Sequence, residues 1–408
     1  MASLNLNDTP SRIYFFQQTI YANLHFWQTW LKTHLAQPEA LDRERHALAK
    51  AISFALPLDE TWSLVFELVQ TLTPLMERRG HWDTWQWVLT RSLETAQRVK
   101  DTAAEVTLSA LLARLLFQQS QFKKGVAGYR RTLRLARQIG DRFNEARACT
   151  NLGYHFIEHG YWQRAEVLCC HALALFEQLD SNHGRAHTEN HLGFLYTRQH
   201  RWEQAQYHLE RACEIWQAMA DGYGLMLGYL NLGGLYNDSG KPDRALNYLA
   251  KGLQQAEQIG EFVAIGRIYI NQGKAYRLLG DWAKAEVCTK QAEAIFQQCT
   301  NLTELARSWN GLGLIYFHQA RWTEADFYLE KSLGLWRSLG IQFEEIELLL
   351  DIGECELARG NAPEAIRRWH EVDQLISSPP VQQIYRHLQP RLHQYHHKLN
   401  SMGLELER

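Results

Sequence analysis

The strongest constraint on this chain is a pattern that returns every 40 residues. Glycine fills one column of the pattern and alanine follows twelve residues later, at Gly153, Gly193, Gly233, Gly273, Gly313 and Gly353 and at Ala165, Ala205, Ala245, Ala285, Ala325 and Ala365. A fixed period in the range of roughly 20–50 residues is typical of a solenoid, in which each unit buries its apolar face only against its neighbours. The period therefore predicts one repeating helical architecture rather than several unrelated domains.

Each 40-residue unit is expected to form two helices. In the unit 141–180, Asp141 is a candidate N-cap, and apolar residues follow at helical spacing. Gly160 offers the left-handed residue that ends many helices, and a second amphipathic stretch comes after it. The glycine inside the first helix costs about 1 kcal/mol relative to alanine. We interpret Gly153 as a point of close helix approach, where the second helix brings the small Ala165 near.

The segment "LGFLYTRQHRWEQA", Leu192 to Ala205, resembles the tetratricopeptide repeat. The usual repeat has about 34 residues and often ends with proline, whereas this unit has 40 and carries Glu177, Gln217, Glu257 and Gln297 in the proline position. The longer form resembles repeats of kinesin light chain, of spindle-orientation adaptors, of the sensor arms of STAND-type signalling ATPases and of peptide-sensing Rap-like regulators. The resemblance implies an all-α, right-handed superhelix of about eight helix pairs.

The ends of the chain depart from the repeat, as solenoid caps do. We expect an N-terminal helical cap at 1–70, with helices near 11–36, 39–55 and 59–78, then the solenoid at 71–376 and a capping helix at 377–408. The capping helix should turn Ile384, Leu388, Leu392, Tyr395 and Leu399 toward the last repeat. The segment before the repeats resembles its counterpart in STAND proteins, but the phosphate loop G-x-x-x-x-G-K-[ST] is absent from the sequence.

Composition narrows the possible partners. The formal net charge is −2 and no block of basic residues occurs, so we expect no nucleic-acid partner and no membrane partner. No apolar run reaches the roughly 20 residues of a membrane span, and the first residues do not resemble a signal peptide. The seven cysteines include no C-x-x-C pair, which favours reduced thiols, a cytoplasmic location and no metal or cofactor. No catalytic motif occurs, so we expect the protein not to be an enzyme.

The tetratricopeptide resemblance implies that the first helix of each pair lines a concave surface. Its ligand-facing columns lie six and two residues before the motif glycine, and one, four and five residues after it. Arginine recurs in the first column and asparagine in the second, which suits a peptide, because asparagine can bind backbone groups and arginine can bind carboxylates. The candidate groove residues are Arg147, Asn151, His187, Asn190, His191, Asn231, Arg267, Asn271, Lys274, Arg307 and Asn310. The alternative is that the asparagines tie neighbouring helices together. On the ligand hypothesis, substitutions in this set should leave fold stability almost unchanged.

Two further clusters have alternative interpretations. His183, His187 and His191 recur at every fourth residue and suit a metal site, a pH-sensitive groove or an ordinary polar surface. Because they extend over two helical turns, we assign no metal ion to them. The N-terminal helix carries Tyr14, Phe15, Phe16, Tyr21, Phe26, Trp27 and Trp30 around its whole circumference. This surplus predicts a docking surface, or a homo-oligomer formed through the aromatic helix.

The function that agrees best with the sequence is binding. We expect an adaptor or sensor subunit that holds a protein or peptide segment in the concave groove. One alternative is a Rap-like aspartyl-phosphate phosphatase of response regulators, or a peptide-controlled regulator of that kind. The other is a purely structural assembly scaffold.

Overall fold

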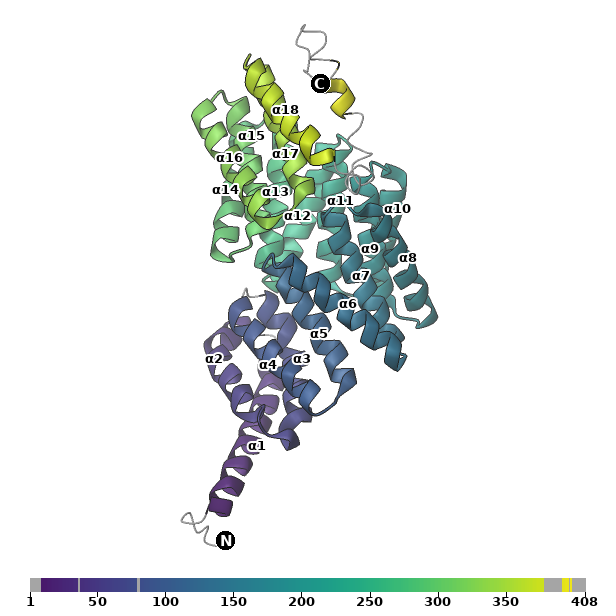
Figure 1. Cartoon of the computed structure of the whole chain (residues 1–408), viewed down its shortest axis with the longest axis vertical. Coiled ribbons are helices and arrows are strands. Elements are labelled where there is room, and N and C mark those ends of the chain that lie inside the picture. Colours follow the sequence, from purple (N-terminus) through teal and green to yellow (C-terminus); the bar gives the residue numbers. More distant parts are fainter. Residues whose placement is uncertain (1–8, 36, 79–80, 378–390, 396, 398–408) are drawn as a thin grey trace. The chain divides into compact units, whose positions relative to one another are not determined.

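The computed structural model describes residues 9–35, 37–78, 81–377, 391–395 and 397. Every secondary-structure element in this part of the chain is helical, as the repeat predicted (Figure 1). The elements are α1 (Thr9–His34), α2 (Pro38–Ala55), the 3-10 turn η1 (Asp59–Thr61), α3 (Trp62–Arg78), α4 (Trp82–Arg98), α5 (Thr102–Gln118), α6 (Phe122–Ile139), α7 (Arg142–Glu158), α8 (Trp162–Gln178), α9 (Asn182–Arg198), α10 (Trp202–Ala218), α11 (Gly222–Asp238), α12 (Pro242–Ile259), α13 (Phe262–Leu278), α14 (Trp282–Gln298), α15 (Leu302–His318), α16 (Trp322–Leu339), α17 (Gln342–Ala358) and α18 (Ala362–Ile376). Among these described helices, none is long and apolar enough to cross a membrane.

Local sequence signals set the helix ends. The Asp141 carboxylate accepts a hydrogen bond from the Asn144 backbone N–H at 3.0 Å, which confirms the expected N-cap. Equivalent caps begin α5, α9, α11, α14 and α15. Gly160 adopts the left-handed conformation with φ +78°, as expected of the residue that ends α7. Because these signals recur every 40 residues, the helices keep nearly constant length.

The chain divides into two compact units. The first unit comprises residues 1–148 with 260–262, and the second comprises 149–259 with 263–408. Residue 70, the expected end of the N-terminal cap, falls inside α3, which packs against α4 within the first unit. Residue 377 directly follows α18. The division into cap, solenoid and capping helix therefore stays a prediction.

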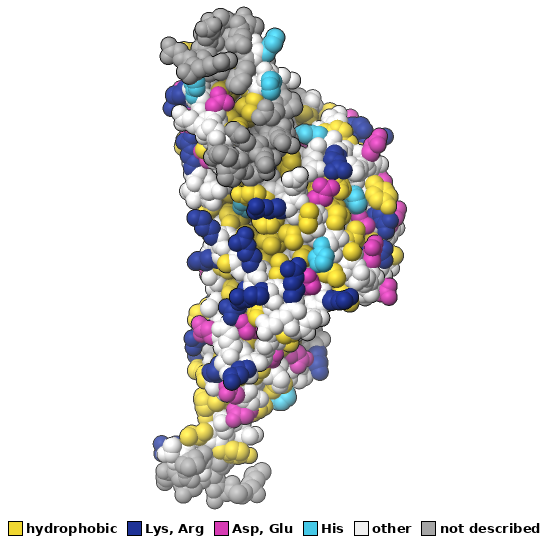
Figure 2. Space-filling view, turned by 45° about the vertical axis from the view of Figure 1, so that its right-hand side comes forward, with side chains coloured by type: hydrophobic (Ala, Val, Ile, Leu, Met, Phe, Trp, Pro, Cys, Tyr) yellow, Lys and Arg dark blue, Asp and Glu magenta, His cyan; other side chains and the backbone are white. Residues whose placement is uncertain are grey.

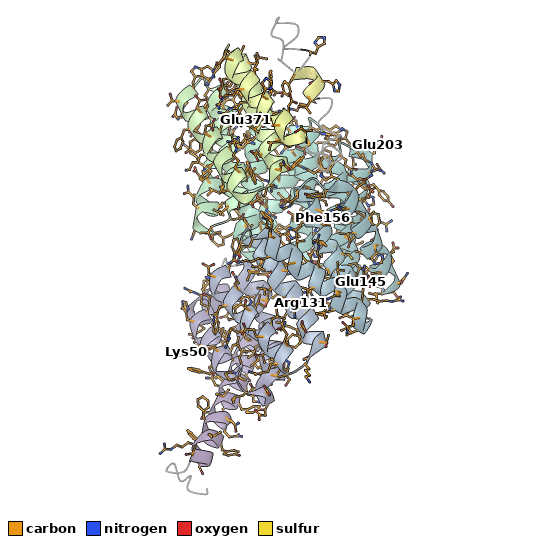
Figure 3. The ribbon with its side chains drawn as sticks, viewed as in Figure 1. Lys50, Arg131, Glu145, Phe156, Glu203 and Glu371 are labelled. Carbon is orange, nitrogen blue, oxygen red and sulfur yellow. The ribbon has the colours of Figure 1, made fainter. Side chains whose placement is uncertain are left out.

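The first unit contains α1 to α6. Trp27 is 7% exposed and packs inward with Leu24 and Leu31, whereas Phe26 remains 56% exposed. The other strongly exposed apolar side chains of α1 are Ile13, Tyr14, Phe15 and Phe16. Successive helices are also joined by ion pairs, such as the one from Arg131 Nε on α6 to Glu105 on α5 at 2.9 Å (Arg131 is labelled in Figure 3). Figure 2 shows hydrophobic side chains among basic and acidic ones on one face of the molecule.

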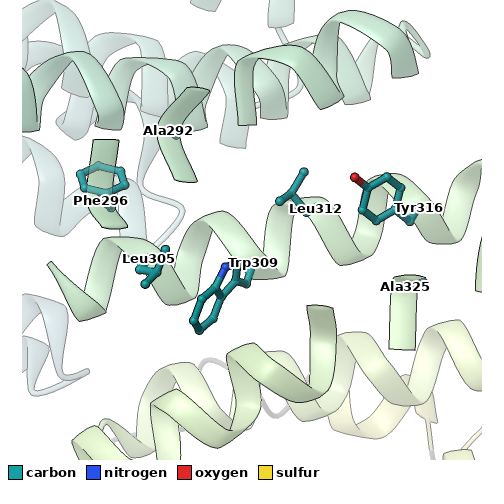
Figure 4. Close-up of a cluster of buried hydrophobic side chains, with 7 residues drawn as sticks. All are labelled: Ala292, Phe296, Leu305, Trp309, Leu312, Tyr316 and Ala325. Atoms are coloured by element: carbon teal, nitrogen blue, oxygen red, sulfur yellow. The ribbon is translucent and has the colours of Figure 1, made fainter. Parts of the chain in front are cut away.

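In the second unit each helix packs against the next one along the chain, with closest contact inside each repeat pair. The buried side chains between α14, α15 and α16 are Ala292, Phe296, Leu305, Trp309, Leu312, Tyr316 and Ala325 (Figure 4). A Cβ atom on Gly153 would lie 2.6 Å from Cys169 Sγ and 3.5 Å from the Ala165 carbonyl oxygen of α8. The glycine column is therefore the point of close helix approach, as predicted.

The described residues of the C-terminal segment pack against the last repeat. Leu392 and Tyr395 are buried, and the Tyr395 ring stacks on Trp369 of α18 with 4.5 Å between ring centroids. These two residues have the predicted orientation. The other expected contact residues, Ile384, Leu388 and Leu399, lie outside the described residues.

Candidate functional site

A cavity of about 340 Å³ lies within the second unit, and we call it the groove. Its wall comes chiefly from the first helices of the repeat pairs, α7, α9, α11, α13, α15 and α17. This is the surface that the tetratricopeptide resemblance implied. Charged side chains make up much of the wall: Glu158, Arg198, Asp238, Arg267, Lys274, Arg277, Glu304, Arg307, Glu344, Glu347 and Asp351.

Arg307 lies at the centre of an ion network that joins three helices. Its Nη2 atom lies 2.8 Å from Glu158 of α7 and 3.0 Å from Glu344 of α17. Its Nη1 atom lies 3.3 Å from Glu304, one turn earlier on α15. The Arg307 side chain is 24% exposed. Its partners are more buried: Glu158 is 11%, Glu344 13% and Glu304 3% exposed. Burial lowers the pKa of Arg307, but the three carboxylates outweigh it and hold the pKa well above its usual value.

Arg267 belongs to the same network, because its Nε atom donates to Glu304 at 2.6 Å. Burial lowers the pKa of Arg267, and Glu304 acts in the opposite direction so strongly that the net shift is upward. Glu304 is thus shared by Arg267 and Arg307. We call these two arginines, with Glu158, Glu304 and Glu344, the Arg307 network. Both arginines already have carboxylate partners inside the protein.

The asparagines differ from one another in their partners. Asn231 donates from Nδ2 to Asn190 Oδ1 at 3.0 Å, which ties α11 to α9. Asn271 Nδ2 donates to the backbone carbonyl oxygen of Arg267, on the same helix, at 3.0 Å. The backbone carbonyl oxygen of Asn271 accepts a hydrogen bond from Asn237 Nδ2 of α11 at 2.8 Å. Asn310 Oδ1 is buried and has no hydrogen-bond partner among the described residues. The helix-tying interpretation therefore fits Asn231 and Asn190, and Asn310 retains an unused acceptor.

The structure brings about half of the predicted groove residues together. The groove is lined by Asn231, Arg267, Asn271, Lys274, Arg307 and Asn310. Arg147, Asn151, His187, Asn190 and His191 are not among its lining residues. Arg147 belongs to the first unit, where burial lowers its pKa. Lys274 pairs with Asp238 at 2.5 Å.

The three histidines at successive turns of α9 have different neighbours. The His187 ring lies 4.5 Å from that of His183 and 5.2 Å from that of Trp216, measured between centroids. His191 Nδ1 lies 3.3 Å from the Thr150 carbonyl oxygen. Burial lowers the pKa of His191 to about 4. Across the described residues, no group of three or more His, Cys, Asp or Glu side chains is arranged to hold a metal ion.

Several groove residues were missing from the predicted set. Glu158, Arg198 and Asp238 each lie five residues after a motif glycine, and Arg277 lies four after Gly273. Both columns are ligand-facing in the tetratricopeptide resemblance, so a usable signal was present. The Arg277 side chain is half-buried and has no hydrogen-bond or ion-pair partner among the described residues. Burial lowers its pKa, while Asp351 and Cys355 oppose that effect.

Comparison with known proteins agrees with this architecture. The tetratricopeptide repeat family matches residues 185–220 and 224–298. No curated protein matches the chain. A solved structure of a Rap protein complexed with competence and sporulation factor has a TM-score of 0.64 at 12% sequence identity and covers 90% of this chain and 99% of its own.

Two further solved structures have the same fold. The Rap conjugation gene regulator of the plasmid pLS20, in complex with the Phr* peptide, has a TM-score of 0.57 at 10% identity, covering 81% of this chain and 96% of its own. Aspartyl phosphate phosphatase F from Bacillus subtilis has a TM-score of 0.53 at 13% identity, covering 93% and 96%. Together with the 40-residue period and the helix pairs, the family match identifies residues 185–220 and 224–298 as tetratricopeptide repeats, and the solved structures have the same fold as the chain.

Proposed function

We propose that the second unit binds a protein or peptide segment in the groove and that the chain acts as a cytoplasmic adaptor or sensor. The observation that carries this proposal is the buried Asn310 Oδ1 in the groove wall, which lacks a partner among the described residues. A buried acceptor left unpaired costs about 1–3 kcal/mol. If the Asn310 amide turns toward the groove that it lines, a backbone N–H of a bound segment would supply the missing hydrogen bond.

The Arg307 network supports the same function in a different way. Because Arg267 and Arg307 are paired with internal carboxylates, they hold α7, α13, α15 and α17 in fixed positions around the groove. A preformed wall lowers the entropy cost of binding an extended segment. The solved pLS20 regulator holds the Phr* peptide on a fold of this kind, which adds support by analogy of fold alone.

The proposal is tested by panning a phage-displayed library of random dodecapeptides against the full chain. The groove variant is Asn310→Ala, and its matched control is Asn247→Ala, an exposed asparagine on α12 that does not line the groove. We expect enriched peptides to bind wild type and the control equally. Asn310→Ala should weaken binding about tenfold, the equivalent of one hydrogen bond of about 1.4 kcal/mol.

Other outcomes would favour the alternatives. Equal binding by the two asparagine variants would remove the groove from the proposal. Failure to enrich any peptide would favour the structural scaffold. If the chain instead releases phosphate from phosphorylated response regulators, the Rap-like phosphatase is the better description.

A further inference from the structure

We infer that the segment bound in the groove carries a carboxylate and that this carboxylate pairs with Arg277. The inference rests on the proposed function and adds the charge of the ligand to it. Five basic side chains line the groove: Arg198, Arg267, Lys274, Arg277 and Arg307. Four of them form ion pairs within the protein. Arg277 forms none among the described residues.

The missing partner of Arg277 has a structural cause. Asp351 of α17 lines the same groove and acts electrostatically on Arg277. However, Asp351 Oδ1 lies 2.5 Å from Arg391 Nη2 of the C-terminal segment. Arg391 also lies 3.4 Å from Glu347 and 3.5 Å from Glu354. Asp351 is therefore paired with Arg391 and not with Arg277.

A half-buried guanidinium without a partner loses hydration and gains no ion pair in return. An incoming carboxylate can accept two parallel hydrogen bonds from it, which is the strongest pairing available to arginine. Arg277 lies on α13 and Asn310 on the neighbouring first helix, α15, in the wall of one groove. The two unused groups, one cation and one amide acceptor, match an acidic residue and a backbone N–H of the same segment.

The carboxylate has two sources in a peptide, an acidic side chain or the free C-terminus. The probes are therefore three pools of random decapeptides. The first contains Asp and Glu and ends in an amide. The second replaces every Asp and Glu by Asn and Gln and also ends in an amide. The third has the second composition but ends in a free acid. Retention of each pool is measured on the immobilised full-length chain.

We expect wild type to retain at least one carboxylate-bearing pool about tenfold better than the neutral pool. The first pool tests the acidic side chain and the third tests the free terminus. Arg277→Gln should abolish this preference while the neutral pool still binds. The control Arg244→Gln changes an exposed arginine of α12 outside the groove and should keep the preference. Arg277→Lys retains the positive charge but cannot donate the two parallel hydrogen bonds of a guanidinium. A reduced preference for carboxylate-bearing pools in that variant therefore separates ion pairing from a folding defect.

A second variant tests why Arg277 has no ion-pair partner. Arg391→Ala releases Asp351, which can then turn to Arg277, so the preference for carboxylates should fall although Arg277 is unchanged. An equal preference in wild type and Arg277→Gln would overturn the inference, as would equal retention of all three pools by wild type. Pools that bind through Asn310 without any carboxylate preference would overturn this inference alone. Failure of every pool to bind would overturn the proposed function as well.

Discussion

Replacing Arg307 by alanine should loosen the second unit at the groove. The substitution leaves Glu158, Glu304 and Glu344 without the guanidinium that lies 2.8–3.3 Å from them. Removing one partner of a buried ion pair costs about 3–5 kcal/mol, because the remaining charge stays buried and unpaired. Arg267 still contacts Glu304, so we expect the lower end of that range, about 3 kcal/mol.

Hydrogen exchange is the appropriate assay, because a chain with two compact units need not unfold in one step. The segments that report on the network are the end of α7, which carries Glu158, and the start of α17, which carries Glu344. A loss of about 3 kcal/mol in the free energy of local opening corresponds to exchange about a hundredfold faster in these segments. Helices α4 and α5 of the first unit serve as the internal reference.

The control is Arg367→Ala on α18, which removes an arginine whose side chain is 58% exposed. We expect exchange in α7 and α17 to be unchanged in this variant, because exposed ion pairs contribute little to stability. Should Arg307→Ala behave like the control, the three carboxylates would not depend on Arg307. The network would then not hold α7 to α15 and α17 in solution. A double-mutant cycle with Glu158→Gln isolates the contact between α7 and α15, and we expect a coupling of at least about 1 kcal/mol.

Two further predictions concern packing and pH. Gly353→Ala should lower the free energy of unfolding by about 1–3 kcal/mol, because the new Cβ would lie 2.1 Å from Nε1 of the buried Trp369. Gly334→Ala on α16, where a Cβ meets open space, should raise it by about 0.5–1 kcal/mol, and hydrogen exchange in α16 and α17 measures both. Burial lowers the pKa of His191 from 6.5 to about 4, so the neutral ring is favoured by folding. Its stabilising contribution is fully present above pH 6.5 and is lost as the pH falls toward 4, and His191→Gln should flatten the dependence of the urea midpoint on pH across that window. A variant with the wild-type slope would show that His191 does not titrate differently in the folded state.

The repeat explains why so much of the fold could be predicted. The glycine and alanine columns, the caps and the turn glycines are local signals, and each is confirmed several times along the chain. Glycine recurs at the position of Gly153 in each of the later units, and a glycine inside a helix indicates a close neighbouring helix. The column therefore identifies the helix contact without any knowledge of the tertiary structure. The resemblance to the tetratricopeptide repeat, rather than the columns themselves, implied that the first helix of each pair forms the wall of the groove.

The contacts inside the groove could not be predicted in this way. Glu158 and Arg307 are 149 residues apart, and they meet only because small rotations between repeats add up along the second unit. A column analysis compares equivalent positions and gives no information about that sum. It therefore assigned Arg267 and Arg307 to a ligand. Because the structure pairs them with internal carboxylates, we now expect substitutions of these arginines to affect stability as well.

The two kinds of column also differ in what they can encode. A residue repeated in every unit, such as the motif glycine, can specify only the regular packing that all units share. A recognition surface needs positions that change from one unit to the next, as the residue six before the glycine does between His187, Arg267 and Arg307. Internal pairing then determines which of these varied side chains remain available to a ligand. If the groove binds a segment as proposed, we expect its specificity to depend less on the arginine column itself than on Arg277 and Asn310, whose hydrogen-bonding groups the described part of the chain leaves unused.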